Sequence, residues 1–411
     1  MAVLLPNYPL AEAVLPKDAS RGGPELCTAV LKAAVAALPV PSPASLELFQ
    51  KQVQSLSQEL TQRLLGIPDL EERLIGIGNR DMMEANHLNH FRFLSAYLVN
   101  PNPDELVSTA RWAIRTYMAH GFRPEYWRVM LPAALELLGK RLPKDVAEDI
   151  APYYGFLAEN LESLLPAPEE QPEAALGLTG SLPPLAARYL ELLLEGDRRQ
   201  ASSLILGQAA GGMPVRDIYL DVFSPAQRML GQLWQENRIS VALEHFATAA
   251  TQMIMSQLFP YIFAQGADQP RLDAGFVGCC VQGELHEIGM RMVCDLLELE
   301  GFDTWYLGAN TPDKGILDFL AEKLRSGAGR TKPIILGVSC TIAQGVPFVE
   351  RLIQALRSDA RLPDVKILVG GLPFLRREDL WLKIGADAHA RDAAEATPVV
   401  RRLAGLTEVG G

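Results

Sequence analysis

The segment GFVGCCVQGELHEIG, from Gly275 to Gly289, begins as an unbroken run of apolar and small residues and ends in charged ones. Such a run predicts a strand buried on both faces, because half-buried strands alternate apolar and polar side chains. His286 follows this strand, between two glutamates, where a helix-like pattern starts. In doubly wound sheets ligands bind at the carboxyl ends of the strands. We therefore expect His286 to belong to a ligand site.

Four more β-rich runs follow this segment, and amphipathic stretches separate them. The expected strands are Gly275–Val281, Asp303–Gly308, Ile334–Cys340, Val365–Gly371 and Ala386–Ala390. The expected helices are Glu287–Glu300, Asp313–Arg325, Ala343–Arg357, Arg376–Ile384 and Ala393–Leu403. This alternation predicts an α/β doubly wound, Rossmann-like domain with a five-stranded parallel sheet over residues 271–406.

The remainder of the 411 residues reads as helical, and a chain of this length is expected to form two or three domains. Residues 1–44 are expected to be an N-terminal extension, and 45–165 an all-helical domain with helices that include Asp69–Asn79 and Lys144–Leu165. Residues 166–184 are rich in proline, glycine and acidic residues and predict a linker. Residues 185–266 are long enough for a four-helix bundle.

Composition excludes several classes of function. A net charge of −11 argues against a nucleic-acid surface. The five cysteines are odd in number and lack a C-x-x-C pair, which indicates reduced thiols and no structural zinc. There is neither a signal peptide nor an apolar run of membrane-spanning length, so we expect a cytoplasmic protein. The sequence has no P-loop and no G-x-S-x-G, and we expect no enzymatic activity.

Small and hydroxylic residues lie at the predicted strand ends beside His286, and this arrangement suits a large flat cofactor. The residues are Gly308, Ser339, Thr341, Gly370 and Gly371, and Glu284 and Gly289 flank His286 in the sequence. Their order and spacing resemble the cobalamin-binding domain family, with its D-x-H-x-x-G, S-x-T and G-G motifs. The resemblance implies that His286 ligates cobalt from below. It also implies that Ser339 and Thr341 bond the nucleotide tail, for which Gly370 and Gly371 leave room.

Glu284 departs from the family pattern, which has aspartate at this position. The acid's role would be to accept the proton of the second imidazole nitrogen and to raise the basicity of the ligand. Glutamate can do this with one more methylene group to place.

The bundle carries a second motif, in which Trp234 is followed after nine residues by Glu244 and His245. This spacing resembles the cobalamin-dependent photoreceptor repressors of carotenoid synthesis. The resemblance implies that Trp234 covers the adenosyl group of adenosylcobalamin, with the Glu-His pair beside it. Light would break the Co–C bond and change the packing of the bundle. We expect a homo-oligomer with light-dependent assembly, acting through itself or an unidentified protein partner.

The N-terminal domain, with its stretches TYMAHGF and ALELLGKRLP, resembles globin-like helical domains, including phycobiliproteins. Combined with the other two domains, it resembles the photocobilins, which use cobalamin and biliverdin together. Non-covalent biliverdin is the expected second chromophore, with haem or an empty domain as alternatives. The candidate pocket residues are His87, His90, Arg92, Arg115, Tyr117 and His120, of which the first two lie on one face of a helix.

The leading hypothesis from the sequence is therefore a light sensor that binds adenosylcobalamin and biliverdin. A second hypothesis is a corrinoid carrier for methyl transfer between separate enzymes. A third is a regulatory adaptor that senses cobalamin level.

Overall fold

The computed structural model describes residues 24–166, 183–326, 333–377 and 379–406. The chain divides into two compact units, the first of residues 1–173 and 235–237 and the second of residues 174–234 and 238–411. The predicted linker lies almost wholly outside the described residues. Within the described ranges, no helix is both long enough and apolar enough to cross a membrane.

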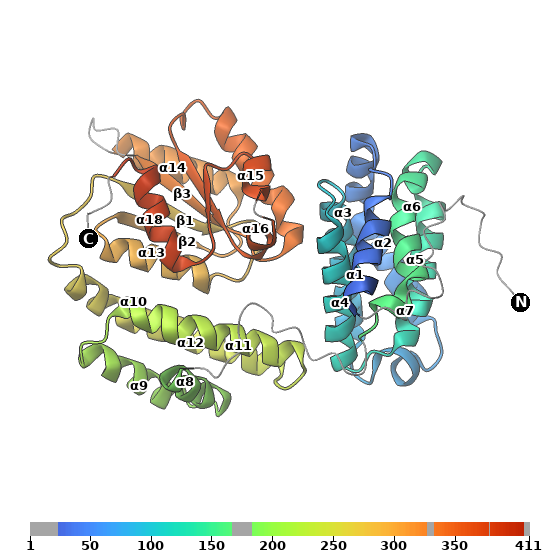
Figure 1. The fold of residues 1–411 in the computed structure, drawn as a ribbon, viewed down its shortest axis with the longest axis horizontal. Helices are drawn as coiled ribbons and strands as arrows, with labels where there is room; N and C mark the ends of the chain where they lie inside the picture. Colours follow the sequence, from blue (N-terminus) through green and yellow to red (C-terminus); the bar gives the residue numbers. More distant parts are fainter. Residues whose placement is uncertain (1–23, 167–182, 327–332, 378, 407–411) are drawn as a thin grey trace, which may run out of the picture. The chain divides into compact units, whose positions relative to one another are not determined.

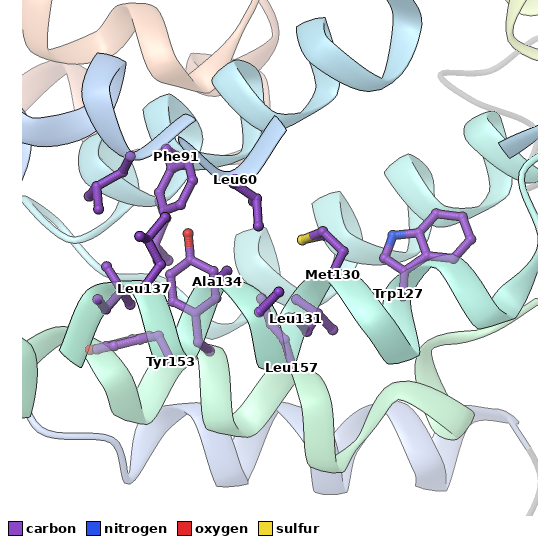
Figure 2. Packing of buried hydrophobic residues seen from close by; sticks show 14 of the residues in the cluster. Leu60, Phe91, Trp127, Met130, Leu131, Ala134, Leu137, Tyr153 and Leu157 are labelled. Carbon is purple, nitrogen blue, oxygen red and sulfur yellow. The ribbon is translucent and has the colours of Figure 1, made fainter. Parts of the chain in front are cut away.

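The first unit is helical throughout its described part. Its elements are α1 (Pro24–Ala36), α2 (Pro43–Leu65), η2 (Glu71–Ile75), α3 (Arg80–Tyr97), α4 (Pro103–Ala119), α5 (Pro124–Arg141), α6 (Lys144–Glu159) and α7 (Leu161–Leu164). Helix starts follow local chemistry: the Ser42 hydroxyl accepts from the backbone N–H of Ser45, and Pro43 opens α2. Aromatic and aliphatic side chains fill the core between the helices, as Figure 2 shows around Phe91, Met130 and Tyr153. The globin-like character of this unit stays a prediction.

Two predicted helices of this unit differ from the observed ones. The helix expected at Asp69–Asn79 is a single π-helical turn, η2, because Gly76 and Gly78 adopt positive φ angles of 79° and 82° and end it. The helix expected at Lys144–Leu165 is interrupted at Asn160, whose φ of −101° lies outside the helical range.

The second unit begins with a group of helices. They are α8 (Pro184–Leu194), α9 (Arg198–Ala210), α10 (Val215–Asp217), η3 (Ile218–Phe223), α11 (Ser224–Gln235) and α12 (Val241–Gln265). Helices α10, η3 and α11 follow one another without a break, so the chain forms four helical segments here. Asp197 and Ser240 cap α9 and α12 by accepting from the backbone N–H groups of Gln200 and Leu243.

A five-stranded, all-parallel sheet follows, with strand order β2-β1-β3-β4-β5, and this part of the fold prediction is confirmed. The strands are β1 (Gly275–Cys280), β2 (Asp303–Gly308), β3 (Ile334–Ser339), β4 (Lys366–Gly370) and β5 (Ala388–Ala390). The chain reverses direction of travel across the sheet at β1 and β3, which makes their carboxyl ends a topological switch point.

Helices cover both faces of the sheet, as Figure 1 shows. On one face lie α13 (Ile288–Leu299) and α18 (Ala393–Leu403), which pack with Phe276 and Cys280. On the other lie α14 (Asp313–Ser326) and α15 (Val346–Ser358), with η4 (Ala343–Gly345) before α15.

The helix expected at Arg376–Ile384 is wrong. Two short helices occur instead, α16 (Leu372–Arg376) and α17 (Leu380–Lys383). The first begins directly after β4 because Gly371, at φ 113°, turns the chain sharply and Pro373 suits the first turn of a helix.

Candidate functional site

His286 lies in the loop between β1 and α13, at the carboxyl edge of the sheet. Its side chain is 66% exposed, whereas that of Glu284 is 1% exposed. One carboxylate oxygen of Glu284, Oε1, lies 2.6 Å from His286 Nδ1 and accepts the backbone N–H of His286 at 2.8 Å. With Nδ1 held in this way, Nε2 is the ring nitrogen left for a ligand.

The two groups shift each other's pKa in the expected directions. The hydrogen bond to Glu284 raises the pKa of His286 above its ordinary value, against the effect of burial, and the charge of Glu244 adds to this. Burial alone would raise the pKa of Glu284, but hydrogen bonds from His286 and from the Thr341 backbone lower it below its ordinary value. Glu284 is therefore a carboxylate at neutral pH, able to hold a proton on Nδ1.

Backbone contacts fix this loop against its neighbours. The second oxygen of Glu284, Oε2, accepts the backbone N–H of Thr341 at 2.5 Å, which ties β1 to the residue after β3. The side chain of Asn310, after β2, accepts the N–H of Gly283 at 2.8 Å. The N–H of Asn310 in turn donates to the Glu284 carbonyl at 2.9 Å. Three strand ends thus position the imidazole.

The predicted residues at the next strand ends fall in one row. Ser339 pairs with Cys280 on one side and with Gly370 on the other, and Gly370 pairs with Ala390. Gly371 comes next, at φ 113°, and a Cβ there would lie 2.0 Å from the carbonyl oxygen of Cys340. No other residue fits this position, so Gly371 is required by the fold itself.

Apolar and small residues surround the imidazole. Leu285 is 70% exposed and Ile342 is 37% exposed. A Cβ added to Gly289 would meet no atom within 4 Å, so the first turn of α13 is open. Exposed apolar side chains of this kind mark a surface that a ligand covers. The sequence prediction missed Leu285 and Ile342, although both immediately adjoin its motif residues.

The bundle contributes a polar group to the same site. Glu244 and His245 lie in the first turn of α12. The charge of Glu244 raises the pKa of His286, so Glu244 lies near His286. Glu244 Oε1 accepts from the Thr248 hydroxyl at 2.9 Å. His245 is 73% exposed, with Nε2 3.5 Å from Glu244 Oε2. Trp234, at the end of α11, packs half-buried against the bundle core.

Glu287, the residue after His286, connects the bundle to the sheet, and the sequence prediction gave it no role. One oxygen accepts from Tyr306 Oη at 2.6 Å and from the backbone N–H of Ala309 at 3.1 Å. The other accepts from Gln252 Nε2 of α12 at 2.7 Å. An acid directly beside the histidine was the only signal that pointed to it.

The candidate residues of the first unit lie in different surroundings, and their role as a chromophore pocket stays a prediction. Arg92 is exposed, and His120 caps α4 with Nδ1 2.8 Å from the Thr116 carbonyl. Arg115 is half-buried, and Tyr117 packs on Phe122 with ring centroids 5.2 Å apart. His87 and His90 both enter the core of the unit.

The residues around His286 in the second unit fit a corrin with a lower imidazole ligand. The fit lies in an exposed imidazole whose Nδ1 is bonded to a buried carboxylate, beside open glycines and uncovered apolar side chains. The sequence-based roles of Ser339, Thr341 and Gly370 toward the nucleotide tail stay predictions.

Known proteins resemble the second unit. Residues 275–400 match the family model of the B12 binding domain, and residues 185–258 match a second B12 binding domain model. Monomethylamine corrinoid protein 1 of Methanosarcina mazei is 28% identical over 196 residues, 47% of this chain and 84% of that protein. Dimethylamine corrinoid protein 3 of Methanosarcina acetivorans is 27% identical over 198 residues, 48% of this chain and 86% of that protein.

Among solved structures, the Methanosarcina barkeri monomethylamine corrinoid protein matches with a TM-score of 0.46 and 21% identity. The match covers 53% of this chain and 98% of that one. Together the family models and the curated relatives support corrinoid binding by the second unit.

The comparisons overturn the light-sensing hypothesis. The relatives are corrinoid proteins of methylamines, so the prediction of a photoreceptor is wrong, and biliverdin as a second chromophore has no support from them. The physical reason is that a helical bundle beside any corrin site can carry residues such as Trp234, Glu244 and His245, whether or not the protein senses light. Photochemistry is a property of the cofactor, and these three residues do not encode it.

Proposed function

We propose that this chain is a corrinoid carrier that accepts a methyl group from one protein and delivers it to another. The observation that carries the proposal is the Glu284–His286 pair, an exposed imidazole whose Nδ1 lies 2.6 Å from a buried carboxylate. The names of the relatives, corrinoid proteins of monomethylamine and dimethylamine, support a methyl group as cargo. A bound corrinoid would then carry a methyl rather than an adenosyl group.

A bound corrinoid supplies a cobalt atom that can take up and release a methyl group. The chain's part is to hold the corrinoid and to set the strength of the lower ligand. Glu284 keeps the proton of His286 on Nδ1 and so directs the Nε2 lone pair outward. Because the Glu284 carboxyl is buried and accepts three hydrogen bonds, it can move little when the charge of its partner changes.

If the chain is a carrier, partner proteins catalyse the transfer of the methyl group to it and from it. In this proposal the chain is not itself the methyltransferase. Its partners are proteins that approach the site where His245 lies exposed.

The test follows repeated methyl transfer in the dark. The full chain is loaded with hydroxocobalamin, reduced, treated with methyl iodide and then with a small thiolate, and the cycle is repeated. The proposal expects one methyl group per corrinoid at each cycle, with the corrinoid staying on the chain in gel filtration. Release of the corrinoid at each turnover, or reaction only under illumination, would contradict it.

Two variants sharpen this test. His286→Ala is expected to lose the spectrum of the imidazole-bound corrinoid and to release the corrinoid during cycling. His120→Ala changes a helix-capping histidine of the first unit and is expected to cycle like the unmodified chain.

A further inference from the structure

Helix α3 of the first unit places two histidines in the core, at a point the corrinoid site does not use. His87 is fully buried, and its Nδ1 lies 2.8 Å from the Thr61 hydroxyl of α2. His90 is three residues further and therefore lies on the same face. Among the described residues, the Nε2 atoms of both rings are buried and have no hydrogen-bond partner.

Both rings meet tyrosines of other helices of the unit. His87 stacks on Tyr126 of α5 with ring centroids 6.1 Å apart, and His90 meets Tyr154 of α6 at 5.2 Å. The Tyr154 hydroxyl is also buried without a partner in the described part of the chain. Phe91, next to His90, points into the same aromatic core (Figure 2).

Three unpartnered polar atoms in the core of one unit are costly. Each buried group left without a hydrogen bond costs about 1–3 kcal/mol, and folded proteins contain few of them. Here two come from α3 and one from α6, whose Tyr154 ring lies 5.2 Å from that of His90. A bound species that contacts all three would remove the cost.

Their chemistry selects the kind of species. Burial lowers the pKa of His87 to about 3, with a contribution from His90, and lowers that of His90 to about 4. Both rings are therefore neutral at pH 7. Neutral imidazole is the commonest protein ligand of borderline divalent metals. A Thr61 hydroxyl that accepts the Nδ1 proton of His87 leaves the lone pair on Nε2, as in metal-bound histidines.

We propose that His87 and His90 bind a divalent transition-metal ion through their Nε2 atoms, with the Tyr154 hydroxyl beside it. No group of three or more histidine, cysteine, aspartate or glutamate residues suited to a metal occurs in the described residues. The remaining coordination positions thus belong to Tyr154 and to water or a small bound molecule. The site is independent of the corrinoid site and of its function.

The test measures metal uptake by the full chain without corrinoid. Tag-free protein is stripped with a chelator, incubated with Zn²⁺ or Co²⁺, and passed through gel filtration before elemental analysis. The proposal expects one ion per chain, and for Co²⁺ the visible bands of a nitrogen-ligated ion. Haemin is added in a separate arm. Binding of haemin without uptake of either ion, or uptake of neither, would overturn the proposal.

Matched variants locate the ion. His90→Ala is expected to weaken binding at least about 10-fold, and Thr61→Val, which keeps both histidines, about 10- to 100-fold. Asn89→Ala, an exposed position on the same helix, is expected to bind like the unmodified chain. Corrinoid uptake by the second unit and far-UV circular dichroism report whether each variant is folded. Folded His90→Ala protein with unchanged affinity would also overturn the proposal.

Discussion

His286 of the second unit and His87 of the first show what surroundings do to the same side chain. His286 is two-thirds exposed and bonded to a buried carboxylate, and its pKa is raised. His87 is fully buried and bonded to a neutral hydroxyl, and its pKa is lowered to about 3. The carboxylate stabilises the imidazolium ion, whereas burial without a charge excludes it. The first unit therefore holds His87 neutral, and the second holds a histidine, His286, that can carry a proton.

Lowering the pH should reduce the stability of the first unit more than that of the second, and this is the largest effect we expect. The folded pKa values of His87 and His90, about 3 and about 4, lie below the ordinary value of 6.5. The unfolded chain therefore binds more protons as pH falls from 6.5 to 4. The free energy of unfolding of the first unit should fall by up to about 1.4 kcal/mol per pH unit for each histidine.

The second unit should behave differently over the same range. The lowered pKa of Glu284 contributes stability that is lost only as pH falls below about 4.5, and the raised pKa of His286 contributes stability that is complete below 6.5. Pulsed hydrogen exchange along a urea titration at pH 7 and pH 5 resolves both units. An equal loss of stability in the two units between pH 7 and pH 5 would contradict the difference expected between their histidines.

Gly371→Ala should destabilise the second unit by about 3 kcal/mol or more. The new Cβ would lie 2.0 Å from the Cys340 carbonyl oxygen, at a φ of 113° that side chains rarely adopt. Gly289→Ala is the matched control, since its Cβ meets nothing within 4 Å, and should change stability by less than about 1 kcal/mol. Urea denaturation of both variants measures the difference, and similar losses would contradict the role given to Gly371.

Glu284→Gln should weaken corrinoid binding about 10- to 100-fold, because the imidazole loses the charge that orients it. The pKa of His286 should fall toward its ordinary value at the same time. Glu284→Asp keeps the charge and should bind within a few-fold of the unmodified chain. Absorption titration with hydroxocobalamin measures the corrinoid affinity of both variants. A Gln variant that binds as tightly as the Asp variant would show that the carboxylate does not orient the ligand.

The smallest effect is expected in the bundle. Thr248→Val removes the hydroxyl that donates to Glu244 Oε1 at 2.9 Å and should cost about 0.5–1.5 kcal/mol. Thr248→Ser keeps the hydroxyl and should cost less. Thermal unfolding followed by circular dichroism compares the two, and an equal loss would show that the hydroxyl contributes no more to stability than the methyl group does.

The strands of the sheet could be predicted from the sequence because each strand corresponds to a local run of apolar residues. Buried apolar runs such as Gly275–Val281 fall within two residues of the observed strands, and the residues after them could be placed at one edge by topology alone. The π-helical turns η2 and η3 could not be predicted, since their hydrogen-bond pattern depends on packing with other helices. The link from Glu287 to Gln252 joins residues 35 positions apart, and no periodicity reveals it.

The function was harder to predict than the fold. Trp234, Glu244 and His245 were interpreted as parts of a light sensor, yet their placement on a bundle near His286 is compatible with any corrin that the bundle covers. Residue spacing places a cofactor, but it does not determine which group the cobalt carries.

The most direct test of the account is the electron paramagnetic resonance spectrum of the full chain loaded with cobalamin and reduced to Co(II), with ¹⁵N-histidine incorporated. One axial nitrogen from ¹⁵N splits each cobalt line into a doublet, whereas ¹⁴N gives a triplet. We predict the doublet in labelled protein and its loss in His286→Ala. A triplet that persists in labelled protein would mean that the corrinoid's own base is the ligand, and would contradict the role of His286.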